Sequence, residues 1–291
     1  MPRNARIPRV LSIAGTDPTG GAGIQADLKS IAANGGYGMA VVTALVAQNT
    51  RGVRSVHLPP VSFLLEQLDA VSDDVEVDAV KIGMLATAEV IHAVSGWLDR
   101  VTPPVVVLDP VMIATSGDRL LDPDAEQALR ELASRVHLLT PNIPELAILA
   151  NEPVATDWQA VLDQASRVSA RYGVVVLAKG GHLESDSVPD ALVDAFGDTV
   201  TITEFPGVRI NTTNTHGTGC SLSSALATWF ARSGQWAESV AESKRWLTES
   251  IRHGAALEVG AGHGPISHFA GLWERGGTTT NSPSPGVTRA S

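Results

Sequence analysis

Short apolar runs alternate with amphipathic segments along most of the 291-residue chain. The apolar runs are rich in aliphatic and β-branched residues and are not interleaved with polar ones, which is typical of strands buried on both faces. Strands are predicted at 10–14, 40–47, 79–82, 105–108, 137–139 and 174–178. Helices are predicted between them, at 23–33, 63–71, 89–100, 125–135 and 158–172. This repeated order predicts an α/β fold in three layers, with a mostly parallel sheet covered by helices on both faces.

The last third of the chain departs from that alternation. Two runs at 191–196 and 200–205 flank Gly197-Asp198 and predict an antiparallel hairpin. Two helices are predicted after it, at 219–232 and 236–258.

We expect a single domain over residues 10–273. Residues 1–9 are predicted to be a flexible N-terminus, and residues 274–291 a disordered tail, because the tail is polar, rich in Pro, Ser and Thr, and without periodicity. After the first predicted helix the chain enters a buried strand directly, so no large lid domain is expected.

Composition excludes several classes of function. Thirty-one acidic residues against 21 basic ones give a net charge of −10, which argues against a nucleic-acid or membrane-surface partner. The single cysteine, Cys220, excludes a disulfide framework, and no cluster of Cys and His has zinc spacing. No apolar run approaches the ~20 residues that a membrane span needs. We therefore expect a soluble, cytoplasmic protein.

Polar and glycine residues follow the predicted strands, at the edge where ligands of a parallel sheet usually bind. These segments are Gly15-Thr16-Asp17, Gln48-Asn49, Gly83-Met84, Asp109-Pro110, Thr140-Pro141-Asn142 and Lys179-Gly180-Gly181-His182. A residue type capable of chemistry after nearly every strand indicates a small-molecule site at this edge.

The first glycine cluster is a weak match to a dinucleotide fingerprint. Gly21-Ala22-Gly23 fits the G-x-G spacing, but residues 28–65 contain no Asp or Glu to bind a ribose hydroxyl. The dipeptide Gly-Lys does not occur, so a Walker A loop is also absent.

A second glycine cluster, at residues 214–220, precedes a strong helical pattern. Gly217 and Gly219 allow successive N–H groups to converge on an anion, and the helix dipole reinforces that nest. Cys220 falls in the first turn, where a helix N-terminus lowers a thiol pKa, and could receive a proton from an attacking hydroxyl. The alternative is a plain glycine turn followed by a buried small side chain.

The second glycine cluster, together with further blocks of the sequence, resembles the hydroxymethylpyrimidine/phosphomethylpyrimidine kinases of the ribokinase-like superfamily. The resemblance runs in order from about residue 10 to about residue 269. It is carried by the blocks 14–29, 43–50, 81–85, 108–112, 140–145, 179–182 and 214–220. It implies an ATP- and Mg²⁺-dependent enzyme that phosphorylates 4-amino-5-hydroxymethyl-2-methylpyrimidine and then its monophosphate. It also implies a homodimer.

The resemblance implies specific roles for the second glycine cluster. Gly217, Thr218 and Gly219 would form the anion hole, and Cys220 would be the catalytic base where most related sugar kinases have Asp. Lys179 would neutralise charge on the transferring phosphoryl group.

Five residues are expected to bind the pyrimidine. Gln48 would hydrogen-bond the aminopyrimidine edge, because an amide both donates and accepts; the family commonly has Glu there. Met84 would lie against the ring as an adaptable apolar contact. Val111 and the backbone at Gly15 and Ala22 would complete the pocket.

The nucleotide and metal are expected at the neighbouring strand ends. Asp109 and Glu145 would organise Mg²⁺ through water, because this ion keeps much of its hydration shell. Asn142 and Lys179 would lie near the phosphates, and Lys244 would approach the adenine. The alternative for Glu145 is an ordinary helix start, which its place after Pro144 also matches.

Three questions stay open at this level. Asp27 either touches substrate or serves the dipole of the first helix. The pocket residues also suit a pyridoxal- or pyridoxine-type vitamin B6 kinase. A catalytically silent pyrimidine-binding protein is the alternative from another class, against which the intact anion hole and Cys220 argue.

Overall fold

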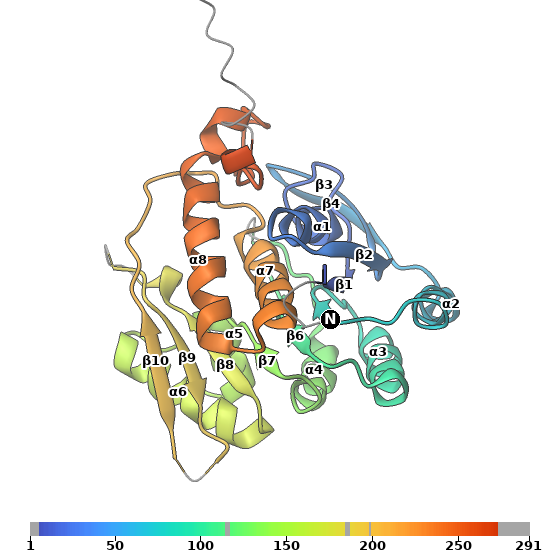
Figure 1. Ribbon diagram of the computed structural model, residues 1–291, viewed down its shortest axis with the longest axis horizontal. Helices are drawn as coiled ribbons and strands as arrows, with labels where there is room; N and C mark the ends of the chain where they lie inside the picture. Colours follow the sequence, from blue (N-terminus) through green and yellow to red (C-terminus); the bar gives the residue numbers. More distant parts are fainter. Residues whose placement is uncertain (1–5, 114–116, 184–186, 198, 273–291) are drawn as a thin grey trace, which may run out of the picture.

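The computed structural model describes residues 6–113, 117–183, 187–197 and 199–272, so most of the predicted N-terminal segment and the predicted tail lie outside the described residues. An eight-stranded sheet has the order β10-β9-β8-β7-β6-β5-β1-β2 (Figure 1). Its strands are β1 Arg9–Ala14, β2 Tyr37–Val42, β5 Ala79–Ile82, β6 Val106–Leu108, β7 Leu138–Leu139, β8 Val175–Lys179, β9 Asp190–Asp194 and β10 Thr201–Phe205.

Six of these strands, from β8 to β2 in the sheet order, are parallel, and β9 and β10 join antiparallel at one edge. The predicted hairpin at 191–205 is therefore confirmed. The mostly parallel, three-layer arrangement is confirmed as well.

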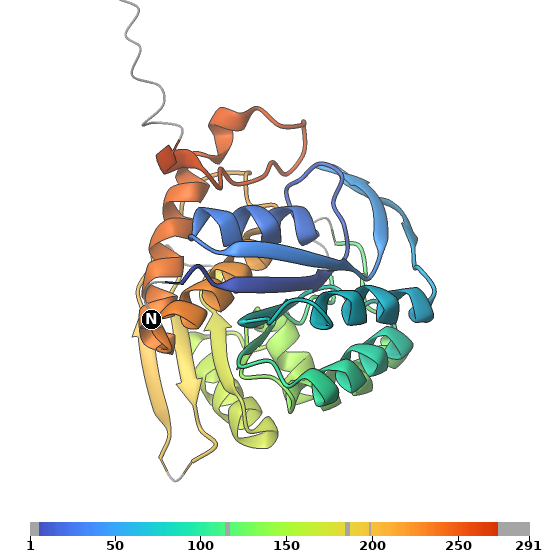
Figure 2. The same cartoon turned by 45° about the vertical axis from the view of Figure 1, so that its right-hand side comes forward.

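Helices cover both faces of the sheet (Figure 2). One face carries α2 Val61–Ser72, α3 Ala88–Val101, α4 Glu126–Ala133, α5 Ile143–Ala150 and α6 Trp158–Tyr172, which pack over the larger apolar cluster. The other face carries α1 Gly23–Ala33, α7 Thr218–Ser233 and α8 Trp236–Arg252. Within the described residues, short 3-10 helices lie at Pro123–Ala125, Gly180–His182 and Gly254–Leu257.

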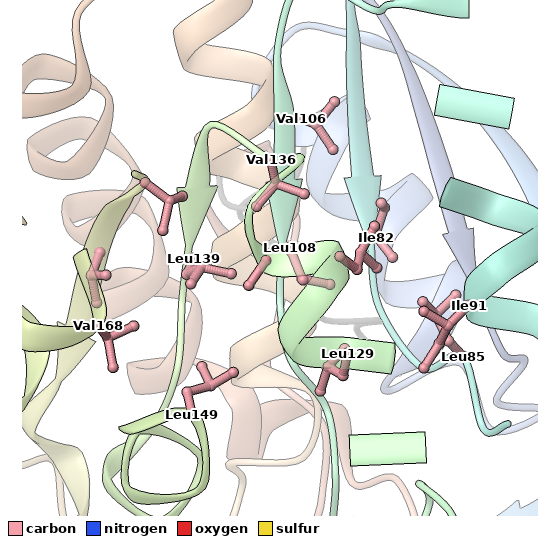
Figure 3. Packing of buried hydrophobic residues seen from close by; sticks show 14 of the residues in the cluster. Ile82, Leu85, Ile91, Val106, Leu108, Leu129, Val136, Leu139, Leu149 and Val168 are labelled. Atoms are coloured by element: carbon pink, nitrogen blue, oxygen red, sulfur yellow. The ribbon is translucent and has the colours of Figure 1, made fainter. Parts of the chain in front are cut away.

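The core consists of aliphatic side chains from the sheet and from the helices above it. Figure 3 shows Leu108 and Ile82 of adjacent strands packed toward Leu129 of α4 and Ile91 of α3. Strand residues that follow one another contribute to opposite clusters: Val106 and Leu108 belong to the larger one and Val107 to the smaller. This division explains why the strands are apolar throughout, since each face of the sheet is buried.

The predicted strand at 40–47 is wrong as one element. β2 ends at Val42, and the next residues form a separate antiparallel pair, β3 Leu45–Asn49 and β4 Gly52–His57. The break occurs where Thr43 donates its hydroxyl to the carbonyl of Met84, 2.6 Å away. That contact follows from tertiary packing, which the apolar pattern cannot report.

One helix boundary differs from the prediction, and one helix lies outside the predicted ranges. The helix predicted at 236–258 ends at Arg252 as α8, and a 3-10 turn follows it. α5 lies outside the predicted helix ranges, but the helix start offered as the alternative for Glu145 is confirmed, since Asn142 and Glu145 form a complete capping box there. No helix in the described ranges is long and apolar enough to cross a membrane.

Candidate functional site

A cavity of about 690 Å³ lies at the carboxyl ends of the parallel strands and extends along α7 toward α8. Every residue predicted for the site lines it. They are Gly15, Ala22, Gln48, Met84, Asp109, Val111, Asn142, Glu145, Lys179, Gly217, Thr218, Gly219, Cys220 and Lys244. Gly15 and Lys179 meet because the ends of parallel strands share one edge of the sheet. The start of α7 adds Gly217 to Cys220, and α8 adds Lys244.

The glycine loop before α7 forms the floor of the cavity. Gly217 is the N-cap of α7 and has a φ of 77°, a left-handed conformation that favours glycine. A Cβ atom at Gly217 would lie 1.8 Å from the carbonyl oxygen of Gly21. The two glycine clusters of the sequence are thus packed directly against each other, and the first supports the second.

A buried hydrogen-bond network centred on Asp17 connects the two clusters. Asp17 is fully buried, and its Oδ2 accepts from His216 Nε2 at 2.8 Å and from the backbone N–H groups of Gly21 and Ala22 at 3.1 and 2.8 Å. Its Oδ1 accepts from the backbone and hydroxyl of Thr19. Burial alone would raise the pKa of Asp17, but the hydrogen bonds from His216 and Thr19 outweigh it and lower the pKa to about 2.

Replacing Asp17 by Asn should lower the free energy of unfolding at pH 7 by about 2 kcal/mol, because the folded pKa is depressed. A carboxylate with a depressed folded-state pKa stabilises the folded protein at pH values above its unfolded pKa near 4. That stabilisation is lost as the pH falls through the folded-state pKa. Urea unfolding at several pH values should show a constant difference between wild type and variant down to about pH 4, and a shrinking one below. A difference that does not depend on pH would contradict this assignment.

A lysine and two carboxylates lie opposite the glycine loop. Lys179 Nζ, at the end of β8, is 3.2 Å from Asp109 Oδ1, which also accepts from the hydroxyl of Thr140 at 3.0 Å. A Cβ atom at Gly219 would be 3.3 Å from Asp109 Oδ2 and 3.5 Å from Lys179 Nζ. A group held by the glycine loop would therefore sit directly against this pair.

Glu145 is nine-tenths buried and is held by the capping box, in which it accepts from the Asn142 N–H at 2.8 Å. Burial raises the pKa of Glu145; Lys179 opposes that effect, and the neighbouring Asp109 charge adds to it. Two carboxylates that repel each other in a partly buried cavity suit a hydrated divalent cation. In the described parts of the chain, no three His, Cys, Asp or Glu side chains are grouped to bind a metal directly.

Cys220 lines the cavity in the first turn of α7 and is partly exposed. The sequence predicts a lowered thiol pKa here, and the structure differs. Burial raises the pKa of Cys220 to about 11; Lys81 lowers it and Asp27 and Asp109 raise it. Desolvation outweighs the helix dipole, so the thiol is protonated at neutral pH in the ligand-free protein.

Sequence reasoning missed much of the far end of the cavity. There Lys244 pairs with Asp190 and donates to the Val188 carbonyl at 3.3 Å, so its charge is already partnered. Val208 and Leu247 add apolar surface near it. Val208 follows β10 at the antiparallel edge, and Lys244 and Leu247 lie on α8. All three fall outside the pattern of parallel strand ends that located most of the other cavity residues.

Gln48 and Met84 lie at the other end of the cavity. Gln48 is near the end of β3 and Met84 follows β5. A Cβ atom at Gly15 would be 3.1 Å from the Met84 sulfur, so glycine permits the methionine to fill this side. Asp27 does not line the cavity; it is fully buried beneath it and is ion-paired with Lys81.

Comparison with known proteins gives one consistent family. The model of the phosphomethylpyrimidine kinase family matches residues 17–267. The hydroxymethylpyrimidine/phosphomethylpyrimidine kinase of Escherichia coli is 49% identical over 264 residues, which cover 90% of this chain and 98% of that protein. A multifunctional thiamine-biosynthesis protein of Corynebacterium efficiens is 54% identical over 268 residues, which cover 92% of this chain but 36% of that longer protein.

Among solved structures, the fold is similar to that of a pyridoxal kinase from Bacillus subtilis, determined as an ADP complex. The TM-score is 0.81 at 31% sequence identity, and the match covers 92% of this chain and 99% of that one. The ribokinase-like architecture expected from the sequence is confirmed by this similarity.

Proposed function

Because the chain belongs to the phosphomethylpyrimidine kinase family, we propose that it phosphorylates 4-amino-5-hydroxymethyl-2-methylpyrimidine to the monophosphate and then to the diphosphate, as a step of thiamine biosynthesis. ATP is the phosphoryl donor in both reactions. The observation that carries this proposal is that the glycine loop, Cys220 and Lys179 line one shared cavity.

The first transfer moves the γ-phosphoryl group of ATP to a primary alcohol. The alcohol oxygen attacks phosphorus as the bond to the leaving ADP oxygen breaks, and the alcohol proton must leave. Thiolate Cys220 accepts that proton. The backbone N–H groups of Gly217 to Gly219 and the Lys179 ammonium stabilise charge on the transferring oxygens.

The second transfer needs no comparable base. Its nucleophile is an oxygen of the monophosphate, which is largely ionised at neutral pH. Catalysis here depends on alignment of the two phosphates and on neutralisation of their charge. One glycine loop and one lysine can serve both reactions, whereas Cys220 serves chiefly the first.

The pyrimidine lies between the β3 strand and the cavity floor. The Gln48 amide pairs with the amino and ring-nitrogen edge, and Met84 contacts the ring face, a suitable use of a polarisable side chain. Val111 and the backbone at Gly15 and Ala22 close the pocket. In this proposed orientation the hydroxymethyl group points toward Cys220, which lines the same cavity.

The nucleotide occupies the other end of the cavity, with its phosphates near Asn142 and Lys179. Lys244 borders the adenine side together with apolar residues of α8. Asp109 and Glu145 suit a hydrated Mg²⁺, which would neutralise phosphate charge when bound. The resemblance further supports a cytoplasmic homodimer, whose subunit number light scattering would measure.

The proposal is tested by end-point ³¹P NMR of the protein with ATP, Mg²⁺ and the hydroxymethylpyrimidine. We expect a monophosphate ester signal first and a diphosphate signal later, with ADP formed in step. Monophosphate alone would remove the second reaction from the proposal. Binding of the pyrimidine with no ATP consumption would identify the chain as a pyrimidine-binding protein.

A vitamin B6 kinase is the second candidate, and one observation favours it: the extensive structural similarity to a pyridoxal kinase. Turnover with the pyrimidine and pyridoxal in competition separates the two, because the ratio of kcat/KM values measures their discrimination directly. We expect the pyrimidine to be preferred, in line with the 49% identity to a pyrimidine kinase along 90% of this chain.

A further inference from the structure

A charged pair, Lys81 and Asp27, is buried beneath the cavity floor and does not line the cavity. Lys81 and Asp27 are both 0% exposed. Lys81 Nζ lies 2.8 and 2.9 Å from the two carboxylate oxygens of Asp27. The same carboxylate accepts from the Ser12 hydroxyl at 2.6 Å and from the Ser224 hydroxyl at 2.9 Å. Four hydrogen bonds thus meet at one buried carboxylate.

Stability alone does not account for this pair. Removing two charges from water is costly, and replacing a buried ion pair by apolar residues of similar volume is often neutral or stabilising. Beyond its two serine partners, the layer between the sheet and these helices contains mainly aliphatic side chains such as Ile31, Leu222 and Leu226. A buried charge pair at this place therefore calls for another role.

The four partners come from four elements, each of which leads into the proposed active site. Ser12 of β1 precedes Gly15, Lys81 of β5 precedes Met84, Asp27 belongs to the helix that begins at Gly23, and Ser224 lies one turn beyond Cys220 on α7. Fixing these four side chains to each other fixes the pocket loops and the start of α7 relative to the sheet.

The Lys81 ammonium also sets the charge next to the site. Burial alone would lower the pKa of Lys81, yet the negative charge of Asp27, with a smaller contribution from Asp109, raises it above its usual range, so Lys81 stays cationic. A Cβ atom at Gly83 would approach Lys81 Nζ to 2.8 Å, which places the ammonium directly under the loop that carries Met84. The charged groups that act on Cys220 are Lys81, Asp27 and Asp109.

We propose that Lys81 and Asp27 are a positioning pair for the first phosphoryl transfer: they hold α7 and the substrate loops in register, and the Lys81 ammonium is the counter-charge of the Cys220 thiolate. This role rests on the proposed kinase function for its effect on turnover. Its effect on the thiol can be measured without any turnover.

The two partners act on Cys220 with opposite signs, which makes a sharp test. Lys81→Met removes the cation, so alkylation of Cys220 by iodoacetamide should become several-fold slower at pH 8 to 9. Asp27→Asn removes the anion and leaves the cation, so alkylation should become faster. Because Cys220 is the chain's single cysteine, loss of total thiol reports this one site.

Both single variants should also lower kcat of the first transfer by about tenfold or more, because both disturb the position of α7. The KM for ATP should change little, since neither residue lines the nucleotide end of the cavity. An exposed ion pair provides the matched control. Arg100 of α3 and Asp69 of α2 lie 2.7 Å apart, and Arg100→Met and Asp69→Asn should change neither the kcat of the first transfer nor the KM for ATP.

A double variant guards against unfolding, because removing one partner of a buried pair is strongly destabilising. Lys81→Met with Asp27→Asn is neutral; the asparagine oxygen accepts from one of the two serine hydroxyls, and its NH2 group can donate to the other. Thermal unfolding should return toward wild type while first-transfer kcat stays low. Thiolate ultraviolet absorbance, corrected with a Cys220→Ala titration, separates ionisation of the thiol from its accessibility.

Two results would overturn the proposal. If both single variants change thiol reactivity in the same direction, the pair does not act through charge. If the double variant recovers first-transfer kcat together with stability, the pair only supports the fold. Absence of turnover in the wild-type protein would instead reject the proposed function, and the alkylation result would still decide the charge role of the pair.

Discussion

Replacing Cys220 by Ala is expected to slow the first phosphorylation by roughly 10²- to 10⁴-fold, the range that a general base contributes. The second phosphorylation should slow by less than about tenfold, because its phosphate nucleophile carries no proton that must be removed. The glycine loop and Lys179 stay in place in this variant, so charge neutralisation is preserved for both reactions.

The measurement uses two separate assays, one started from the alcohol and one from the monophosphate, each coupled to ADP formation. Equal losses in the two assays would contradict the base assignment and would indicate that Cys220 only shapes the pocket. Cys220→Ser serves as the matched variant, since it keeps a small polar side chain but replaces the thiol with a hydroxyl of higher pKa.

The raised thiol pKa also predicts how the rate of the first transfer depends on pH if Cys220 is its base. Burial raises the pKa of Cys220 to about 11, so below that value the thiolate fraction increases about tenfold for each unit of pH. The first-transfer rate should therefore rise with pH between 7 and 9, as a base-dependent step does, and the second-transfer rate should not rise in parallel. In Cys220→Ala the rise should disappear.

Replacing Gly217 by Ala is expected to reduce both transfers by about 10²- to 10³-fold or more, the loss associated with a missing anion-hole donor. An alanine there has a left-handed φ of 77° and a Cβ 1.8 Å from the Gly21 carbonyl oxygen. The backbone of one glycine cluster must then move away from the other. The N–H groups that should converge on the phosphoryl group would no longer do so.

Gly96 supplies the control for this substitution. It lies within α3, and no atom lies within 4 Å of its added Cβ. Gly96→Ala should leave both rates unchanged and raise stability by about 0.5–1 kcal/mol, the usual gain from alanine in a helix interior. Steady-state kinetics and thermal unfolding of the two variants test the comparison. Wild-type rates in Gly217→Ala would show that this loop does not bind the transferring group.

Much of the architecture follows from patterns that are local in the sequence. Apolar runs of strand length, separated by amphipathic segments, predict the parallel sheet and its two helical layers because both signals depend on neighbouring residues. The same pattern failed at Thr43, where a hydroxyl bonded to the Met84 carbonyl diverts the chain into the β3–β4 pair. It also missed α5, whose capping box was visible but whose helical run is short.

The location of the candidate site was equally accessible from the sequence. Residues that follow parallel strands must meet at one edge of the sheet, so a list of strand ends already names most of the cavity wall. The end of the cavity proposed for the nucleotide was harder to predict because α8 and the antiparallel edge contribute to it. Lys244, expected to approach adenine, is partnered by Asp190, a contact across 54 positions that spacing does not predict.

By itself the sequence determined the layered fold, the glycine loop and the types of residue that surround the cavity. Only the tertiary structure decided the electrostatic surroundings of the residues in and beneath the cavity. Asp17 meets His216 across 199 positions and Lys81 meets Asp27 across 54, and burial raises the pKa of the Cys220 thiol despite its place at a helix N-terminus. The physical reason is that desolvation and Coulomb interaction depend on neighbours in space, whereas periodicity and turn chemistry depend on neighbours along the chain.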